Sequence, residues 1–74
     1  MYDPFLNTIK ILHTEVLWQM LLMIRENIEV LEKHILTYEK NKDYKNYYKS
    51  FEYLNRCRWK VLEVSKEIEG RILK

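Results

Sequence analysis

The sequence contains no alanine, and its 74 residues include one glycine, one proline and one cysteine. A lone cysteine, Cys57, excludes an internal disulfide. Together with His13 and His34 it lacks the close paired spacing of a zinc site, so we expect no metal and no cofactor. Domains of this length are marginally stable unless a disulfide, a metal or oligomerisation supports them. Of these three, oligomerisation remains, and the composition therefore predicts a homodimer or larger assembly.

The low cysteine content also bears on the cellular location of the protein. A single cysteine, with no basic leader followed by an apolar segment and no lipidation motif, predicts a cytoplasmic (intracellular) protein without membrane association. Missing alanine, alongside many Ile, Lys, Asn and Tyr residues, is typical of an AT-rich genome. We therefore expect a virus or plasmid as the source.

Charge is divided unevenly along the chain. Residues 1–37 carry three basic and five acidic groups, whereas residues 38–74 carry ten basic and six acidic groups. The net charge of the whole chain is only +2. The halves have opposite signs, which favours folding of one against the other.

The densest apolar segment is Val16–Ile24, in which Gln19 is the one polar residue. Nine residues are too few to cross a bilayer, which needs roughly 20. An amphipathic helix normally has one apolar stripe over about a third of its circumference, but this segment is apolar nearly all round. The segment therefore predicts contact with protein on two or more sides.

A first helix is predicted over about residues 4–40. Asp3 is a favoured N-cap, and Pro4 suits the first helical position because its missing N–H would be unbonded there. Neither glycine nor proline interrupts residues 5–38. Apolar residues recur there at helical steps of three and four, at positions 5, 9, 12, 16, 20, 24, 28, 31, 35 and 38.

A turn is predicted at residues 41–43, where the apolar stripe lapses. Asn41 tolerates the left-handed conformation of a helix C-cap, and Asp43 can cap a following helix. The alternative is one uninterrupted helix of about 100 Å in a long coiled coil. No glycine or proline excludes that alternative, but the complementary charges of the two halves favour the turn.

The second helix is predicted over about residues 44–73, with Gly70 weakening its last turn. Its expected core stripe comprises Tyr44, Tyr47, Phe51, Leu54, Val61, Ile68 and Ile72, continued by Arg58 and Ser65. The chain is thus predicted to be all-α, a single antiparallel helical hairpin over residues 1–74. Expected facing pairs are Tyr38 with Tyr47, Leu31 with Leu54, Met23 with Val61, and Val16 with Ile68, with Arg58 near Glu26. Because one hairpin leaves half of each apolar face in water, two hairpins are predicted to dimerise into a four-helix bundle.

An apolar row on the back of the first helix is the first candidate interface. At 100° per residue, Ile11, Trp18 and Leu22 lie opposite the main stripe, and Leu21 adjoins them. One interpretation is a docking surface for a second protein with Trp18 as its anchor, because tryptophan is enriched at binding hot spots. The other is that the row belongs to the homodimer interface.

A basic row on the second helix is the second candidate. Seven basic and two acidic residues lie within residues 40–60. Basic groups can neutralise phosphates and aromatic rings can stack on bases, which would suit RNA or duplex DNA. The alternative is an ordinary solvated face, with Glu52 and Arg56 as an i,i+4 pair. The possible contact residues are Lys42, Lys45, Lys49, Arg56 and Lys60.

Other polar and aromatic residues have structural explanations. Tyr38, Tyr44, Tyr47 and Tyr48 crowd the turn end, either as a recognition tip or as an aromatic plug of the core. Cys57 is expected to be a small buried residue. Five polar residues on or beside the core stripes are expected to set helix register rather than to perform chemistry, so no catalytic site and no enzyme is predicted: His13, Asn27, His34, Arg58 and Ser65.

In its layout of helix, turn and helix, the chain resembles the plasmid-encoded Rop-type RNA-binding hairpin dimers, and also small helical-hairpin adaptors of archaeal viruses. The resemblance lies in this layout and not in a shared motif. It implies either an adaptor or inhibitor that homodimerises and binds another protein, or nucleic-acid binding through the basic row. The first of these is the leading expectation, because apolar surface exceeds what one hairpin can bury.

Overall fold

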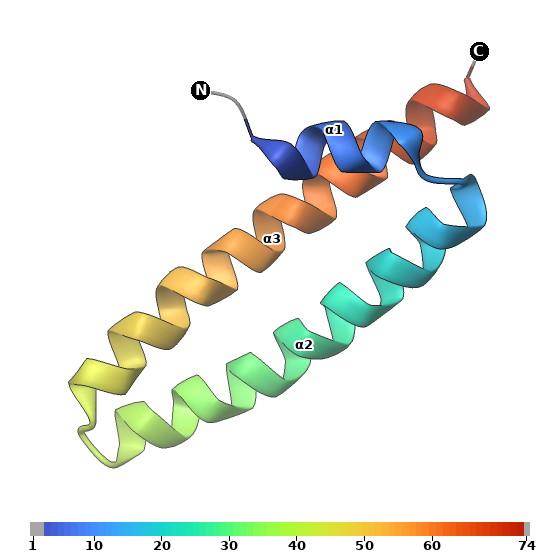
Figure 1. The fold of residues 1–74 in the computed structure, drawn as a ribbon. Coiled ribbons are helices and arrows are strands. Elements are labelled where there is room, and N and C mark those ends of the chain that lie inside the picture. Colours follow the sequence, from blue (N-terminus) through green and yellow to red (C-terminus); the bar gives the residue numbers. More distant parts are fainter. Residues whose placement is uncertain (1–2, 74) are drawn as a thin grey trace.

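A computed structural model describes residues 3–73 and consists of three helices: α1 (Pro4–Ile11), α2 (Thr14–Lys40) and α3 (Tyr44–Ile72). Helices α2 and α3 run antiparallel, and α1 lies across α3 at the end of the hairpin remote from the turn (Figure 1). The predicted all-α class is confirmed. Within these residues, no helix combines the length and the apolar content that a membrane span requires.

The chain enters α1 at the predicted capping residues. The Asp3 carboxylate accepts a hydrogen bond of 2.9 Å from the backbone N–H of Phe5, and Pro4 occupies the first helical turn. Asp3 thereby bonds one of the four amide groups that have no partner inside a helix. The predicted helix start is confirmed.

The prediction of one helix over residues 4–40 is wrong, because Leu12 and His13 are extended, with ψ angles of 149° and 150°. In an unbroken helix, residues 4–11 would project past the end of α3, where the described chain offers nothing to cover Ile9. The break folds α1 back across α3, and Ile9 is then only 3% exposed. Burial of such a side chain contributes about 1.5–3 kcal/mol, which favours the broken arrangement.

The turn lies at residues 41–43, so the alternative of one continuous helix is wrong. The left-handed residue is Lys42, with φ 58°, while Asn41 has φ −88°. The expectation that Asn41 takes this conformation is therefore wrong by one position. The Asp43 carboxylate accepts hydrogen bonds from the backbone N–H of Asn46 at 3.4 Å and from its side-chain amide at 2.8 Å, which confirms Asp43 as the cap.

The core follows two matching stripes at alternating steps of three and four. Along α2 the covered positions are Thr14, Leu17, Leu21, Ile24, Ile28, Leu31, Ile35 and Tyr38. Along α3 they are Tyr47, Ser50, Leu54, Cys57, Val61, Val64, Ile68 and Arg71. These spacings are those of a heptad seam between two helices. Leu17 and Val64 are fully buried, and they pack in one cluster with Ile9, Leu21 and Ile68.

The expected register is correct near the turn but wrong at the far end. Met23 and Val16 were expected in the core, yet they are 64% and 39% exposed. Leu17 occupies the covered position in place of Val16, and Ile24, which the predicted stripe already includes, occupies that of Met23. On α3, Phe51 is 40% exposed, and the stripe passes through Cys57 and Val64, which confirms burial of Cys57.

Arg71 and an aromatic contact fasten α1 to α3. The Arg71 guanidinium donates to the backbone oxygens of Ile9 and Lys10, at 3.0 and 3.2 Å, and to the Thr14 hydroxyl at 3.2 Å. It thus bonds carbonyls in the last turn of α1, where a positive charge also suits the helix dipole. At the other end of α1, the Phe5 ring lies 5.8 Å from that of Trp59.

Candidate interaction surface

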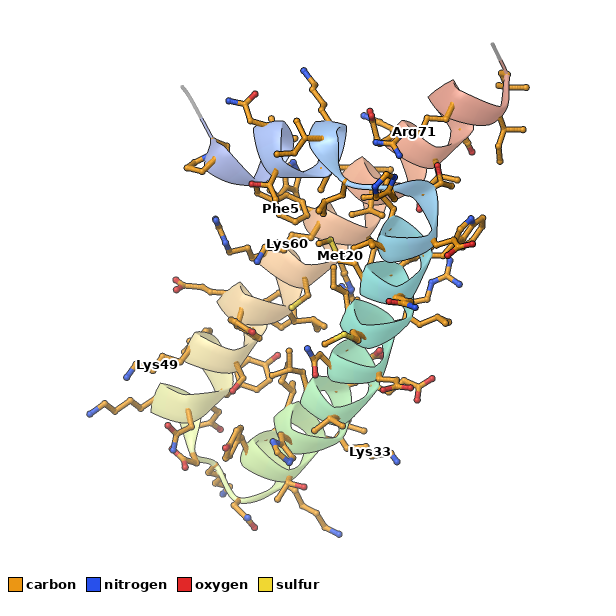
Figure 2. All side chains as sticks on the ribbon, turned by 45° about the vertical axis from the view of Figure 1, so that its right-hand side comes forward. Phe5, Met20, Lys33, Lys49, Lys60 and Arg71 are labelled. Carbon is orange, nitrogen blue, oxygen red and sulfur yellow. The ribbon has the colours of Figure 1, made fainter. Side chains whose placement is uncertain are left out.

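The position of α1 distinguishes two long sides of the hairpin. Met20 packs against the core cluster that includes Ile9, and Trp59 and Lys60 contact Phe5. Figure 2 shows Met20, Lys60 and Phe5 in the same upper part of the molecule, beside α1. We call the side that carries these residues the α1 side, and the opposite side the uncovered face. No element within residues 3–73 covers the latter.

The uncovered face consists of one stripe on each long helix, next to the core stripe. Its large apolar side chains are Trp18, Leu22 and Leu36 on α2, and Tyr44, Tyr48, Phe51, Leu62 and Ile72 on α3. Each is at least 40% exposed; Trp18 is 48% and Leu22 is 59% exposed. Exposed apolar side chains scattered singly are normal. Here they gather toward the two ends of the face, with Arg25, Glu29 and Glu32 on α2 and Arg58 on α3 between them, and such grouping marks an interaction surface.

The four residues expected at the interface do not lie together. Trp18 and Leu22 are on the uncovered face, but Leu21 is 3% exposed and belongs to the hairpin's own core. Its assignment to an interface is wrong because the core stripe runs one position from the expected one. Ile11 is 83% exposed, but it belongs to α1, so the extended residues 12–13 separate it from the helical row of Trp18.

The uncovered face carries both signs of charge. Arg25, Glu29 and Glu32 are exposed on the α2 stripe, and Arg58 is exposed on the α3 stripe. The expected core position of Arg58 near Glu26 is wrong: Arg58 is solvent-exposed, and the ion pairs within residues 3–73 involve Lys66 and Arg71 instead. Arg58 is therefore available on a surface whose α2 stripe carries Glu29 and Glu32 beside a single basic residue, Arg25.

The turn-end tyrosines divide between core and surface. Tyr38 and Tyr47 are half-buried, whereas Tyr44 and Tyr48 are 55% and 65% exposed. The Tyr47 ring packs against Tyr48 at 5.3 Å and against Phe51 at 6.0 Å between centroids. Half of the tyrosine cluster thus closes the core at the turn, and the other half extends the uncovered face.

The α1 side has a shallow groove of about 290 Å³ along α2. Its lining is apolar except for two amide side chains, and comprises Val16, Gln19, Met20, Met23, Ile24 and Asn27. Methionines adapt their shape to a partner because they are unbranched and flexible. The groove is therefore a second, smaller apolar surface on the opposite side from the first.

The basic row lies mostly on the α1 side of α3. Lys45 lies on the outer side of this helix, away from α2, and Lys42 lies in the turn. Lys45, Lys49 and Arg56 are exposed, as is Lys42 in the turn. Lys60 is different: its ammonium lies 5.3 Å from the centre of the Phe5 ring and its side chain is half-buried. Four of the five expected contact residues are thus accessible, while the fifth is engaged with α1.

Two further expectations concern polar groups. No polar or charged residue is buried in the part of the chain that the structure describes, so the expectation that polar residues inside the core set its register is wrong. His13, Asn27, His34 and Arg58 are exposed, and Ser65 is half-buried. Residues 3–73 contain no group of three or more His, Cys, Asp or Glu side chains placed to hold a metal ion.

Sequence reasoning missed Arg71, and it missed Phe51 and Leu62 as surface residues. The spacing of Leu54, Cys57 and Val61 could have identified Phe51 and Leu62 as surface residues. Its alternating steps of three and four fit a heptad seam between two helices better than the stripe through Phe51 and Arg58 does. Arg71 had no such signal, because its role depends on a break in another helix.

Comparisons of the chain with protein-family models, with curated proteins and with solved structures find no match.

Proposed function

We propose that this protein is a non-enzymatic binding module that homodimerises through its uncovered face into a bundle of four long helices, and that it binds another protein as an adaptor or inhibitor. The observation that carries the proposal is the set of eight large, exposed apolar side chains on the side away from α1. Each Leu or Phe that moves from water into an interface contributes up to about 1.5–3 kcal/mol. Such gains are the main favourable term in most protein association.

A second copy of this chain suits the uncovered face for two reasons. The face spans both long helices, as the inner face of a four-helix bundle does. It also has acidic residues, Glu29 and Glu32, on α2 and a basic residue, Arg58, on α3. In a two-fold contact the same surface serves both partners, so pairing of α2 with α3 across the dimer would bring opposite charges together.

The groove on the α1 side supports the adaptor part of the proposal. Because it lies opposite the uncovered face, dimerisation would leave Met20 and Met23 accessible to another protein. A helix of that protein with one large apolar side chain would fit a groove of about 290 Å³. In this arrangement each dimer would present two equivalent grooves, which suits a protein that joins partners.

The test of dimerisation compares two matched substitutions. Leu22→Asp places a charge on the uncovered face, whereas Val30→Asp places the same charge on the α1 side, and the two wild-type residues are 59% and 51% exposed. We expect Leu22→Asp to weaken dimerisation at least tenfold, because a carboxylate would be desolvated in the interface. Val30→Asp should leave the dimer intact. Sedimentation velocity over a concentration series measures both, with circular dichroism as the control for helix content.

The outcomes separate the parts of the proposal. If both substitutions dissociate the dimer equally, or if neither dissociates it, the result contradicts dimerisation through the uncovered face.

The adaptor part is tested by placing a photo-crosslinking amino acid at Met23 and, separately, at Lys33 on the outer side of α2, in cells of the natural source. Reproducible crosslinking of one protein from position 23 but not from 33, abolished by Met20→Asp, supports it. Crosslinks that do not depend on position or on Met20 contradict it.

A further inference from the structure

Apart from Arg58, the dimer and adaptor proposal does not use the basic residues of α3. Those nearer the hairpin turn form a compact strip beyond the end of α1. Lys49, Tyr53 and Arg56 recur at steps of four and three on the α1 side, and Lys45 adjoins them one turn nearer to the hairpin turn. Tyr53 is 54% exposed. We call these four residues the basic strip. It presents an aromatic ring between two cationic side chains on one face of a helix.

The strip ends where α1 begins to cover α3. Lys60 is the next basic residue along the same stripe, but it lies over the Phe5 ring, at 5.3 Å from the ring centre, and is half-buried. Glu63 and Glu67 follow on that stripe, where α3 carries its two ion pairs within residues 3–73. On this stripe the accessible positive charge is therefore confined to the half of α3 nearer the turn.

The surroundings of the strip leave its charge uncompensated. On the facing α1-side stripe of α2, the neighbouring positions are Asn27, Val30, His34 and Thr37, none of which is acidic. The nearest acidic residues in sequence are Glu52, which is exposed, and Asp43, which is half-buried and caps α3. The ion pairs found within residues 3–73 involve neither of them nor the strip. Unpaired cations around an exposed ring differ from an ordinary solvated helix face, where charges of both signs usually alternate.

We propose that the basic strip binds single-stranded nucleic acid, with Lys45, Lys49 and Arg56 contacting phosphates and Tyr53 stacking on a base. Aromatic side chains can stack only on bases that are not enclosed in a duplex, so the exposed ring of Tyr53 favours a single strand. From Lys45 to Arg56 the strip is about 16 Å long at 1.5 Å per residue, which suits a short segment of a few nucleotides. This proposal is independent of dimerisation, because the strip and the uncovered face lie on opposite sides.

Fluorescence anisotropy with a labelled 12-nucleotide oligouridine, and with a duplex of equal length, tests the proposal at several salt concentrations. Three phosphate contacts on a single strand predict a slope of about −2 for log K against log salt concentration. Lys49→Gln with Arg56→Gln should reduce the slope to about −0.7. The matched control is Lys10→Gln with Lys33→Gln, which removes the same charge elsewhere; Figure 2 shows Lys33 and Lys49 on opposite sides of the molecule.

A second pair of variants isolates the ring. Tyr53→Leu should weaken binding of the oligouridine at least about fivefold, because stacking is lost, whereas Tyr53→Phe should bind like the wild type. Equal losses from the Lys49/Arg56 and the Lys10/Lys33 variants would show that only net charge matters and would overturn the proposal. Tighter binding of the duplex, with Tyr53→Leu unchanged, would overturn the assignment to single strands. Absence of binding at 50 mM salt would remove the strip as a nucleic-acid site.

Discussion

The two ends of the hairpin are built differently. At the end that α1 covers, five buried residues from three helices form one cluster: Ile9, Leu17, Leu21, Val64 and Ile68. At the turn end only α2 and α3 are present, and their buried residues are Ile35, Leu54 and Cys57. Two helices can shield a seam between them, but a third is needed to enclose it.

This difference suggests what each end requires from other molecules. Helix α1 supplies a third helix for the α1 side near Met20, but it covers nothing on the uncovered face and nothing beside the turn. We propose that a second copy of the chain covers the uncovered face. On the other side, beside the turn, the part of α3 that α1 leaves open carries the basic strip, where we propose that nucleic acid binds. The following predictions test the contrast between the two ends, from the largest expected effect to the smallest.

Matched truncations on α2 should reveal unequal packing. Leu17 is fully buried and Leu31 is half-buried at an equivalent position of the same stripe. We expect Leu17→Ala to lower the free energy of unfolding by about 3 kcal/mol and Leu31→Ala by about half as much, because loss scales with the cavity that remains. Urea denaturation of the wild type and the two variants, all at the same protein concentration, measures both losses. Equal losses would contradict the view that α1 makes its end the better packed.

Removal of the Arg71 contacts should loosen α1 selectively. Arg71→Met keeps much of the side-chain volume but loses the hydrogen bonds to Ile9, Lys10 and Thr14, and we expect a loss of about 1–2 kcal/mol. Hydrogen exchange should accelerate over α1 and stay unchanged near the turn. The control is Lys66→Met, because Lys66 makes only a surface contact of 3.7 Å with Glu63, which contributes little. Uniform acceleration along the chain would argue against a local role for Arg71.

A substitution at the end of α3 should stabilise the protein slightly. Gly70 is exposed inside the helix, has no positive φ, and an added methyl group would meet nothing within 4 Å. Gly70→Ala should therefore raise the free energy of unfolding by about 0.5–1 kcal/mol, because alanine is the better helix former and restricts the unfolded chain. Thermal denaturation measures the gain. A decrease would contradict the view that Gly70 only weakens the last turn of α3.

Much of this fold follows from local patterns in the sequence. The cap formed by Asp3 and Pro4, the turn at residues 41–43 and the cap at Asp43 are all local features, and each was predictable. The break at Leu12 and His13 was not, because neither residue prevents a helix. It results from burial of Ile9 against α3, which depends on where another helix ends.

The candidate surfaces were only partly predictable for the same reason. Spacing identified Trp18 and Leu22 as outward-facing, but a register error of one residue placed Leu21 among them. In a segment that is apolar nearly all round, periodicity does not identify the stripe that faces α3. The accessible charge of Lys49 and Arg56 was evident from the sequence, whereas the engagement of Lys60 by Phe5 depends on α1 folding back.

The most direct test of the central claim is the mass of the unmodified protein in solution, measured by sedimentation equilibrium from low to high micromolar concentration. The chain has a mass of 9.3 kDa, and we predict that twice this mass is approached as concentration rises. Helix content measured on the same samples shows whether the chain is folded. A fully helical protein that keeps the mass of one chain at every concentration would contradict dimerisation through the uncovered face.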